Sequence, residues 1–157
     1  MIRGDIIIDG KLQKMGDIPK NLGILIESPG FISDLTGFEN LEILASIRNI
    51  ISKKDINNIL ETVNLQEDKN TKVKNYSLGM LQRLGVAQAI MENPDILILD
   101  EPFNSLDAEG VIELRNIINR YVSENDVTML ITSHNKDDID FMTDEIIRIE
   151  DKKLKKD

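Results

Sequence analysis

The chain has 157 residues, of which 41% are apolar and 30% are charged, and it contains neither Cys nor Trp. This composition is typical of one globular domain with its own core, and it excludes both intrinsic disorder and a disulfide-stabilised scaffold. The 28 acidic and 19 basic side chains leave a net charge of −9, which disfavours binding to nucleic acids.

The first predicted element is a β-hairpin. Ile6 to Ile8 is an apolar, β-branched run, and it precedes Asp9 and Gly10, a dipeptide typical of two-residue hairpin turns.

No apolar run reaches the roughly 20 residues that a membrane-spanning helix needs, and Asp5 interrupts the stretch that a signal peptide would keep apolar. We therefore expect a cytoplasmic protein with no direct membrane insertion, in agreement with the absence of Cys.

A short strand and three helices are predicted next. The strand covers Leu22 to Ile26 and reaches Glu27, where Ser, Pro and Gly at 28–30 favour a turn. Thr36 can cap the first helix, with Glu39 three residues later. The second helix is predicted to begin at residue 54 or 55, and the third is predicted over 77–91, separated from it by a polar loop at 66–75.

The second half of the chain alternates strands and helices. Residues 96–99 are four consecutive apolar residues, which predicts a strand covered on both faces. A helix over 108–121 and a strand over 127–132 follow, and 145–149 is predicted to be a last strand that runs into a turn and a solvated, lysine-rich tail. The chain therefore belongs to the α/β class.

Two adjacent carboxylates, Asp100 and Glu101, follow the predicted strand over 96–99. Ligands of open α/β sheets bind at the carboxyl ends of strands. Neighbouring residues of an extended segment point in different directions, so one carboxylate can hold Mg²⁺ while the other faces a water molecule. The alternative is an ordinary strand end that happens to be acidic.

Ser77 and Gly79 open the third predicted helix. The free N–H groups and positive dipole end of a helix favour phosphate, and a glycine allows close approach to the backbone. The alternative is a plain helix cap by Ser77.

Asp107 lies six residues after Glu101, and His134, the only histidine, follows the predicted strand over 127–132. His134 could hydrogen-bond a terminal phosphate or could have a purely structural role.

Together these segments resemble the nucleotide-binding subunit of ABC transporters, particularly the bacitracin and lantibiotic resistance or export type. Residues 76–82 look like a variant of the signature motif, 96–101 like Walker B, 104–107 like the D-loop, and 133–134 like the switch histidine. Residues 24–31 resemble the Q-loop region. The resemblance implies a P-loop NTPase fold with a parallel-sheet core at 1–30 and 93–157 and a helical signature subdomain at 31–92.

The sequence departs from the family pattern at several positions. Glu27 stands where most members have glutamine, and Tyr76, Leu78 and Met80 replace leucine, glycine and glutamine of the signature. The phosphate loop, G-x-x-x-x-G-K-S/T, is missing altogether, because the nearest candidate, at 4–12, has one residue too many and ends in leucine. The sequence therefore resembles a family domain without its first several dozen residues.

The resemblance also implies roles for individual residues. Asp100 would position Mg²⁺, with Glu27 touching the metal or its water, and Glu101 would act as general base. His134 would hydrogen-bond the γ-phosphate of ATP. Ser77 and Gly79, with Asp107 of the D-loop, would complete the nucleotide site of a second copy across a dimer.

The function implied is ATP hydrolysis that powers export of a peptide antibiotic or a similar substrate, on the cytoplasmic face of the membrane. A transmembrane permease subunit would be the partner, and the segment 31–38 would either dock against it or belong to the core of the subdomain. Without a phosphate loop we expect these 157 residues alone to be inactive.

Two alternatives remain. One is a non-enzymatic module that only binds partners. The other is the carboxyl-terminal half of a chromosome or DNA-repair ATPase, and the net charge and the absence of heptads disfavour this second alternative.

Overall fold

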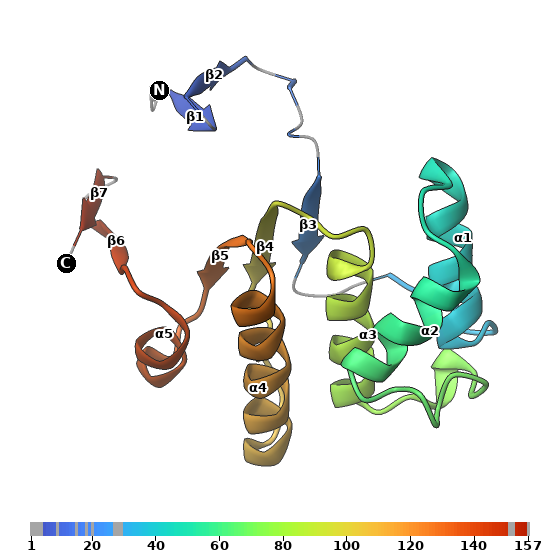
Figure 1. Ribbon diagram of the computed structural model, residues 1–157. Coiled ribbons are helices and arrows are strands. Elements are labelled where there is room, and N and C mark those ends of the chain that lie inside the picture. Colours follow the sequence, from blue (N-terminus) through green and yellow to red (C-terminus); the bar gives the residue numbers. More distant parts are fainter. Residues whose placement is uncertain are drawn as a thin grey trace.

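The computed structural model describes residues 5–8, 10–14, 16–17, 19, 21–26, 30–150 and 153–156. Figure 1 shows its elements, which in chain order are β1 (Ile6–Ile8), β2 (Lys11–Gln13), β3 (Leu22–Leu25), α1 (Gly37–Arg48), α2 (Lys53–Thr62), the 3₁₀ turn η1 (Val73–Asn75), α3 (Leu78–Ile90), β4 (Ile96–Asp100), α4 (Ala108–Glu124), β5 (Thr128–Thr132), α5 (Lys136–Met142), β6 (Ile147–Glu150) and β7 (Lys153–Lys156). The helices in the described ranges are all too short or too polar to cross a bilayer.

A parallel three-stranded sheet, in the order β3-β4-β5, forms the centre of the fold. In Figure 1, α1, α2 and α3 lie beyond β3, whereas α5 and the hairpin of β6 and β7 lie beyond β5. Each pair of neighbouring strands is connected through helices, as parallel strands require. The observed architecture confirms the α/β class, with three helices inserted between β3 and β4.

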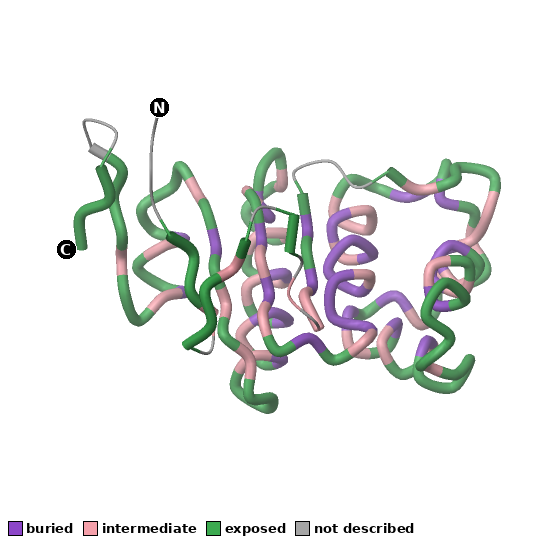
Figure 2. Tube along the Cα trace, turned by 90° about the horizontal axis from the view of Figure 1, so that it is seen from above, coloured by how far each residue is buried: buried purple, intermediate pink, exposed green. Residues whose placement is uncertain are grey.

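The two faces of this sheet differ in burial. Leu25, Leu97 and Leu99 share one face by register, and each is at most 1% exposed because they pack in the core together with buried side chains of α3 and α4. Ile24 and Leu130, on the other face, remain 44% and 56% exposed. On β4 itself, Ile96 and Ile98 lie on this second face and are partly buried, so the prediction that β4 is covered on both faces holds only in part. Figure 2 shows the same alternation of buried and exposed positions along the strands.

The caps predicted from sequence are present in the helical segment. Thr36 accepts a hydrogen bond from the backbone N–H of Glu39 at 3.1 Å, and the Glu39 carboxylate accepts one from the Thr36 N–H at 2.8 Å, forming a capping box. Ser52 and Asp55 form a second capping box, so α2 begins at Lys53 rather than at residue 54 or 55. Apolar side chains from all three helices fill a common core: Leu41, Ile56, Leu60, Leu84 and Ile90.

The hairpin of β1 and β2 has the predicted two-residue connection, since Ile8 pairs with Lys11. Two features at the carboxyl end differ from the prediction. Helix α5 was not predicted, because a seven-residue helix is too short to show an apolar period. The lysine-rich tail is exposed as expected, but it forms β7, because β6 offers it a complete antiparallel register from Ile147 to Glu150.

Candidate functional site

The end of β4 carries Asp100 and the end of β5 carries Thr132, which are partners in the parallel register. The Thr132 hydroxyl donates to a carboxylate oxygen of Asp100 at 2.7 Å, and it accepts a hydrogen bond from the backbone N–H of Glu101 at 3.1 Å. One hydroxyl therefore holds both the side chain of Asp100 and the backbone of the next residue. Thr132 could not be predicted as part of this group, because the sequence shows only a hydroxyl residue at the end of another predicted strand.

Glu101 turns the chain away from the strand, with a φ of +48° that is unusual for a residue other than glycine. This turn directs the Glu101 side chain towards the segment after β5. Its Oε1 lies 3.5 Å from Nε2 of His134, and its Oε2 accepts from the backbone N–H of His134 at 3.4 Å. The imidazole of His134 is 98% exposed, whereas the Glu101 side chain is 20% exposed. The structure thus brings Asp100, Glu101 and His134 together.

Ser77 and Asp107 cap helices that begin near each other. Ser77 Oγ accepts from the backbone N–H of Met80 at 3.2 Å, and an Asp107 carboxylate oxygen accepts from that of Gly110 at 2.8 Å. A Cβ on Gly79 would come within 4.0 Å of Leu106, the residue before Asp107. Ser77, Gly79 and Asp107 therefore form a second group, in which the cap predicted as the plain alternative for Ser77 is observed and Asp107 forms a further cap.

Tyr76, which replaces the leucine of the common signature, is 8% exposed. Its hydroxyl donates to the carbonyl oxygen of Asp68 at 3.0 Å, and a Cβ on Gly37 would lie only 2.6 Å from that hydroxyl. Burial, together with the nearby Asp68, raises the pKa of Tyr76. Tyr76 therefore anchors the start of α3 to the loop after α2 and to the first turn of α1.

Arg83 connects α3 to its surroundings. One guanidinium nitrogen donates to a Glu113 carboxylate oxygen at 2.8 Å and to the Asn64 carbonyl at 3.1 Å, while Nε donates to the carbonyl of Gly79 at 3.4 Å. Glu113 belongs to α4, and Asn64 follows α2. The helix that carries Gly79 is thereby tied to both the helical segment and the helix that Asp107 caps.

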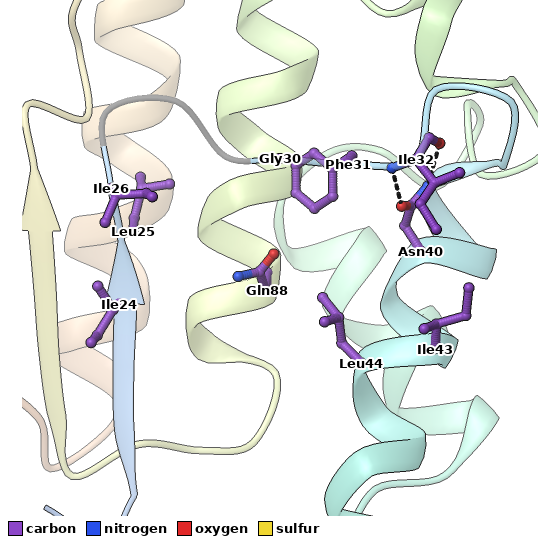
Figure 3. A pocket seen from close by; sticks show the side chains of 10 residues that line it. All are labelled: Ile24, Leu25, Ile26, Gly30, Phe31, Ile32, Asn40, Ile43, Leu44 and Gln88. Atoms are coloured by element: carbon purple, nitrogen blue, oxygen red, sulfur yellow. Dashed lines mark hydrogen bonds between the residues drawn. The ribbon is translucent and has the colours of Figure 1, made fainter. Parts of the chain in front are cut away.

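Glu27 lies outside the described residues, but the segment that follows it is held by Asn40. Asn40 is 5% exposed; its side chain accepts from the Ile32 N–H at 2.8 Å and donates to the carbonyls of Ile32 at 3.1 Å and Thr36 at 2.9 Å. Figure 3 shows Asn40 beneath Ile32. A buried amide with its hydrogen bonds satisfied fixes the backbone of this loop.

A cavity of about 280 Å³ opens between β3 and α1. Figure 3 shows Gln88 of α3 between its two walls, and the lining is mainly apolar, with Ile24, Ile26, Phe31, Ile43 and Leu44. In the segment 31–38, Phe31 and Phe38 pack against the core, while Ile32 is 53% exposed. The segment therefore combines core residues with an exposed apolar residue at the rim.

The family model described as "ABC transporter" matches residues 1–104, about two thirds of the chain. The chain belongs to the ABC transporter family. The family's P-loop NTPase fold agrees with the parallel sheet and the inserted helices, and the resemblance found in the sequence is confirmed.

Several known relatives are transport proteins. The "Bacitracin transport ATP-binding protein BcrA" of Enterococcus faecalis is 47% identical over 125 residues, which cover 80% of this chain and 41% of the relative. The protein of the same name from Bacillus licheniformis is 41% identical, covering 88% and 45%. The "Lantibiotic transport ATP-binding protein SrtF" of Streptococcus pyogenes is 36% identical, covering 90% and 60%. The chain thus spans about half the length of these relatives.

The family of the chain implies nucleotide binding. The Asp100 carboxylate suits Mg²⁺, which prefers oxygen ligands. In the described ranges no three His, Asp or Glu side chains gather closely enough to hold a metal by themselves. The sequence also has no G-x-x-x-x-G-K-S/T, the loop whose backbone N–H groups and lysine hold the phosphates. Asp100 is therefore a candidate for one oxygen ligand of Mg²⁺, and these 157 residues do not supply the phosphate loop.

Proposed function

We propose that this chain is the part of an ABC transporter's ATP-binding subunit that carries the hydrolytic carboxylate. The observation that supports this most directly is the convergence of Asp100, Glu101 and His134 at the carboxyl ends of two adjacent parallel strands. Ligands of open α/β sheets bind at this edge. The family of the chain supports nucleotide as the ligand.

Each of these residues has a role that its position allows. Bound Mg²⁺ would neutralise phosphate charge and polarise the terminal phosphate of ATP. Asp100, held by Thr132, is directed at the metal or its water. Glu101 accepts a proton from the attacking water as general base. His134, exposed and beside Glu101, donates a hydrogen bond to the terminal phosphate.

We further propose that Ser77 and Gly79 act on the nucleotide of a second copy. Helix α3 is 13 residues long, and Ser77 and Leu78 at its start are exposed, with Gly79 beside Leu106. The N–H groups of its first turn that Ser77 does not cap can contribute to anion binding. Asp107 would lie at the same junction between copies. A dimer across ATP, with Glu27 at the metal or its water, follows from the family resemblance.

The partner we propose is a transmembrane permease subunit, which places the chain on the cytoplasmic face of the membrane. The apolar cavity between β3 and α1 is suited to an apolar segment of such a partner, since Ile24, Ile26 and Ile32 at its rim are each at least 44% exposed. The names of the bacitracin and lantibiotic relatives favour a peptide antibiotic as the transported substrate.

A second candidate is a non-enzymatic module that only binds partners. It is favoured by the absence of a phosphate loop from these 157 residues. Phosphate release by the chain joined to a phosphate loop separates the two functions, because a module that only binds partners should show no turnover even then.

The decisive experiment joins a phosphate loop to the chain. An amino-terminal family segment with G-x-x-x-x-G-K-S/T is fused before residue 1, and phosphate release is measured. We expect turnover by the fusion, none by the 157 residues alone, and a loss of about 100-fold or more in kcat with Glu101→Gln. The matched control is Glu109→Gln, an exposed acid in the first turn of α4. Equal turnover with and without the Glu101 carboxylate would contradict the proposal.

A further inference from the structure

Asp138 is the single acidic residue buried within the described part of the chain, at 3% exposure. It lies in the first turn of α5, four residues after His134. Removing a carboxylate from water costs free energy, because the charge loses its hydration. A buried carboxylate is therefore found where other groups compensate its charge and its hydrogen bonds. The function proposed above gives Asp138 no role.

The two carboxylate oxygens of Asp138 bind two different groups. One forms an ion pair with a guanidinium nitrogen of Arg115 from α4. The other accepts from the hydroxyl of Ser133 at 2.9 Å, and that hydroxyl in turn accepts from the backbone N–H of Asn135 at 3.1 Å. Asp138 therefore holds the residue before His134 directly and the residue after it through one hydroxyl.

Arg115 connects Asp138 to the segment that follows Glu101. Its guanidinium group lies 5.8 Å from the ring centre of Phe103 and 5.4 Å from that of Phe141. Phe103 is buried two residues after Glu101, while Phe141 belongs to α5. A cation between two aromatic rings is favourable, and a planar guanidinium stacks better than an ammonium group.

We propose that Asp138, paired with Arg115, is a positioning residue that sets the backbone of residues 133–135 and hence the place of His134 beside Glu101. The imidazole of His134 is 98% exposed, so its own packing cannot hold it. Its position is instead fixed by the backbone on each side of it, which is anchored through Ser133. The importance of the Asp138–Arg115 pair for catalysis rests on the proposed function. The placement of His134 by this pair does not rest on it.

A single histidine makes the placement measurable. The chain, produced without a histidine tag and labelled with ¹⁵N only at histidine, gives one backbone amide signal, that of His134. Labelling at tyrosine instead gives the signals of Tyr76 and Tyr121, which report on the folded core. The measurement needs no nucleotide, so its result does not depend on whether the proposed ATPase function is correct.

We expect Asp138→Asn to shift and broaden the His134 signal while both tyrosine signals stay in place. Asp137→Asn is the matched control, since Asp137 is an exposed neighbour on α5, and it should leave the signal unaltered. If Asp138→Asn also abolishes the tyrosine signals, Ser133→Ala decides, because it removes only the hydroxyl that connects Asp138 to the loop. Ser133→Ala should broaden the His134 signal, beyond the change in shift that any replacement of the preceding residue causes, and Ser133→Thr should restore the sharp signal.

Two results would overturn the proposal. One is a His134 signal that stays as sharp in Ser133→Ala as in the parent chain. The other is a His134 signal that moves in these variants only together with the signals of Tyr76 and Tyr121, which would mean a general loss of stability.

Discussion

Gly23 of β3 lies directly against the backbone of Ala89 in α3. A Cβ on Gly23 would come within 2.1 Å of the Ala89 carbonyl oxygen, which is far closer than nonbonded atoms approach. The absence of a side chain at residue 23 therefore sets how closely α3 packs on the sheet. Since Ser77 caps α3 and Gly79 lies in its first turn, this contact also helps to determine where that candidate site lies relative to β4.

We expect Gly23→Ala to lower the free energy of unfolding by about 1–3 kcal/mol or more, because a backbone carbonyl cannot move aside as a flexible side chain can. Urea denaturation followed by circular dichroism measures this change. Gly30→Ala is the matched control: nothing lies within 4 Å of its Cβ position and its φ is not in the left-handed region. Equal stability of the two variants would contradict the packing argument.

Stability should fall at acidic pH because of the capping boxes. Hydrogen bonds from the backbone N–H and hydroxyl of Thr36 lower the pKa of Glu39, and those from Ser52, the hydroxyl first, lower that of Asp55. A carboxyl group whose pKa is lower in the folded state stabilises the fold at pH values above its unfolded pKa. That contribution is lost as the pH falls through the folded pKa.

The loss should begin below about pH 4.3, the ordinary pKa of a glutamate. Thermal melting of the chain between pH 6 and 3 measures it, with Glu39→Gln and Asp55→Asn as variants. Each variant should be less stable than the parent at neutral pH and should lose less stability on acidification. A parallel pH dependence in parent and variants would exclude the capping carboxylates as the cause.

Tyr76 and Tyr121 provide a matched comparison of two buried hydroxyls. Tyr76 donates to the Asp68 carbonyl at 3.0 Å, whereas the hydroxyl of Tyr121 is 3.5 Å from the Ile90 carbonyl, at the limit of a hydrogen bond. We expect Tyr76→Phe to cost about 0.5–1.5 kcal/mol of unfolding free energy, and Tyr121→Phe to cost less. The reverse order in urea denaturation would show that Tyr76 does not anchor the start of α3.

The partly open face of the sheet should make the isolated chain self-associate. Leu130 is 56% exposed on β5 and pairs in register with Ile98 of β4, which pairs with Ile24 of β3, so the three form an apolar stripe. Sedimentation velocity should show oligomers at micromolar concentration, and Leu130→Lys should reduce them. Ile112→Lys, at a residue 59% exposed on α4, is the control. A parent chain that sediments only as a monomer would refute this prediction.

Much of the fold could be predicted from local patterns. The hairpin before Lys11, the capping box at Thr36 and the helix that begins after Ser77 all depend on interactions between residues a few positions apart. The candidate carboxylates could be located for the same reason, because Asp100 and Glu101 directly follow an apolar run and proximity to a strand end is visible in one dimension.

Other features depend on partners distant in sequence. The role of Thr132 requires the register of β5 against β4, and the burial of Asp138 requires Arg115, 23 residues earlier, to reach it. The exposure of Leu130 likewise follows from which face of the sheet the helices cover. None of these relationships leaves a periodic signal in the chain.

The sequence by itself determined the class of fold, the family motifs and the identities of the charged groups, since these follow from short-range periodicity, capping and residue chemistry. Only the tertiary structure decided which groups meet: Glu101 with His134, Asp138 with Ser133, and Gly23 with Ala89. The physical reason is that hydrogen bonds and close packing act over about 3–4 Å in space, whatever the separation along the chain.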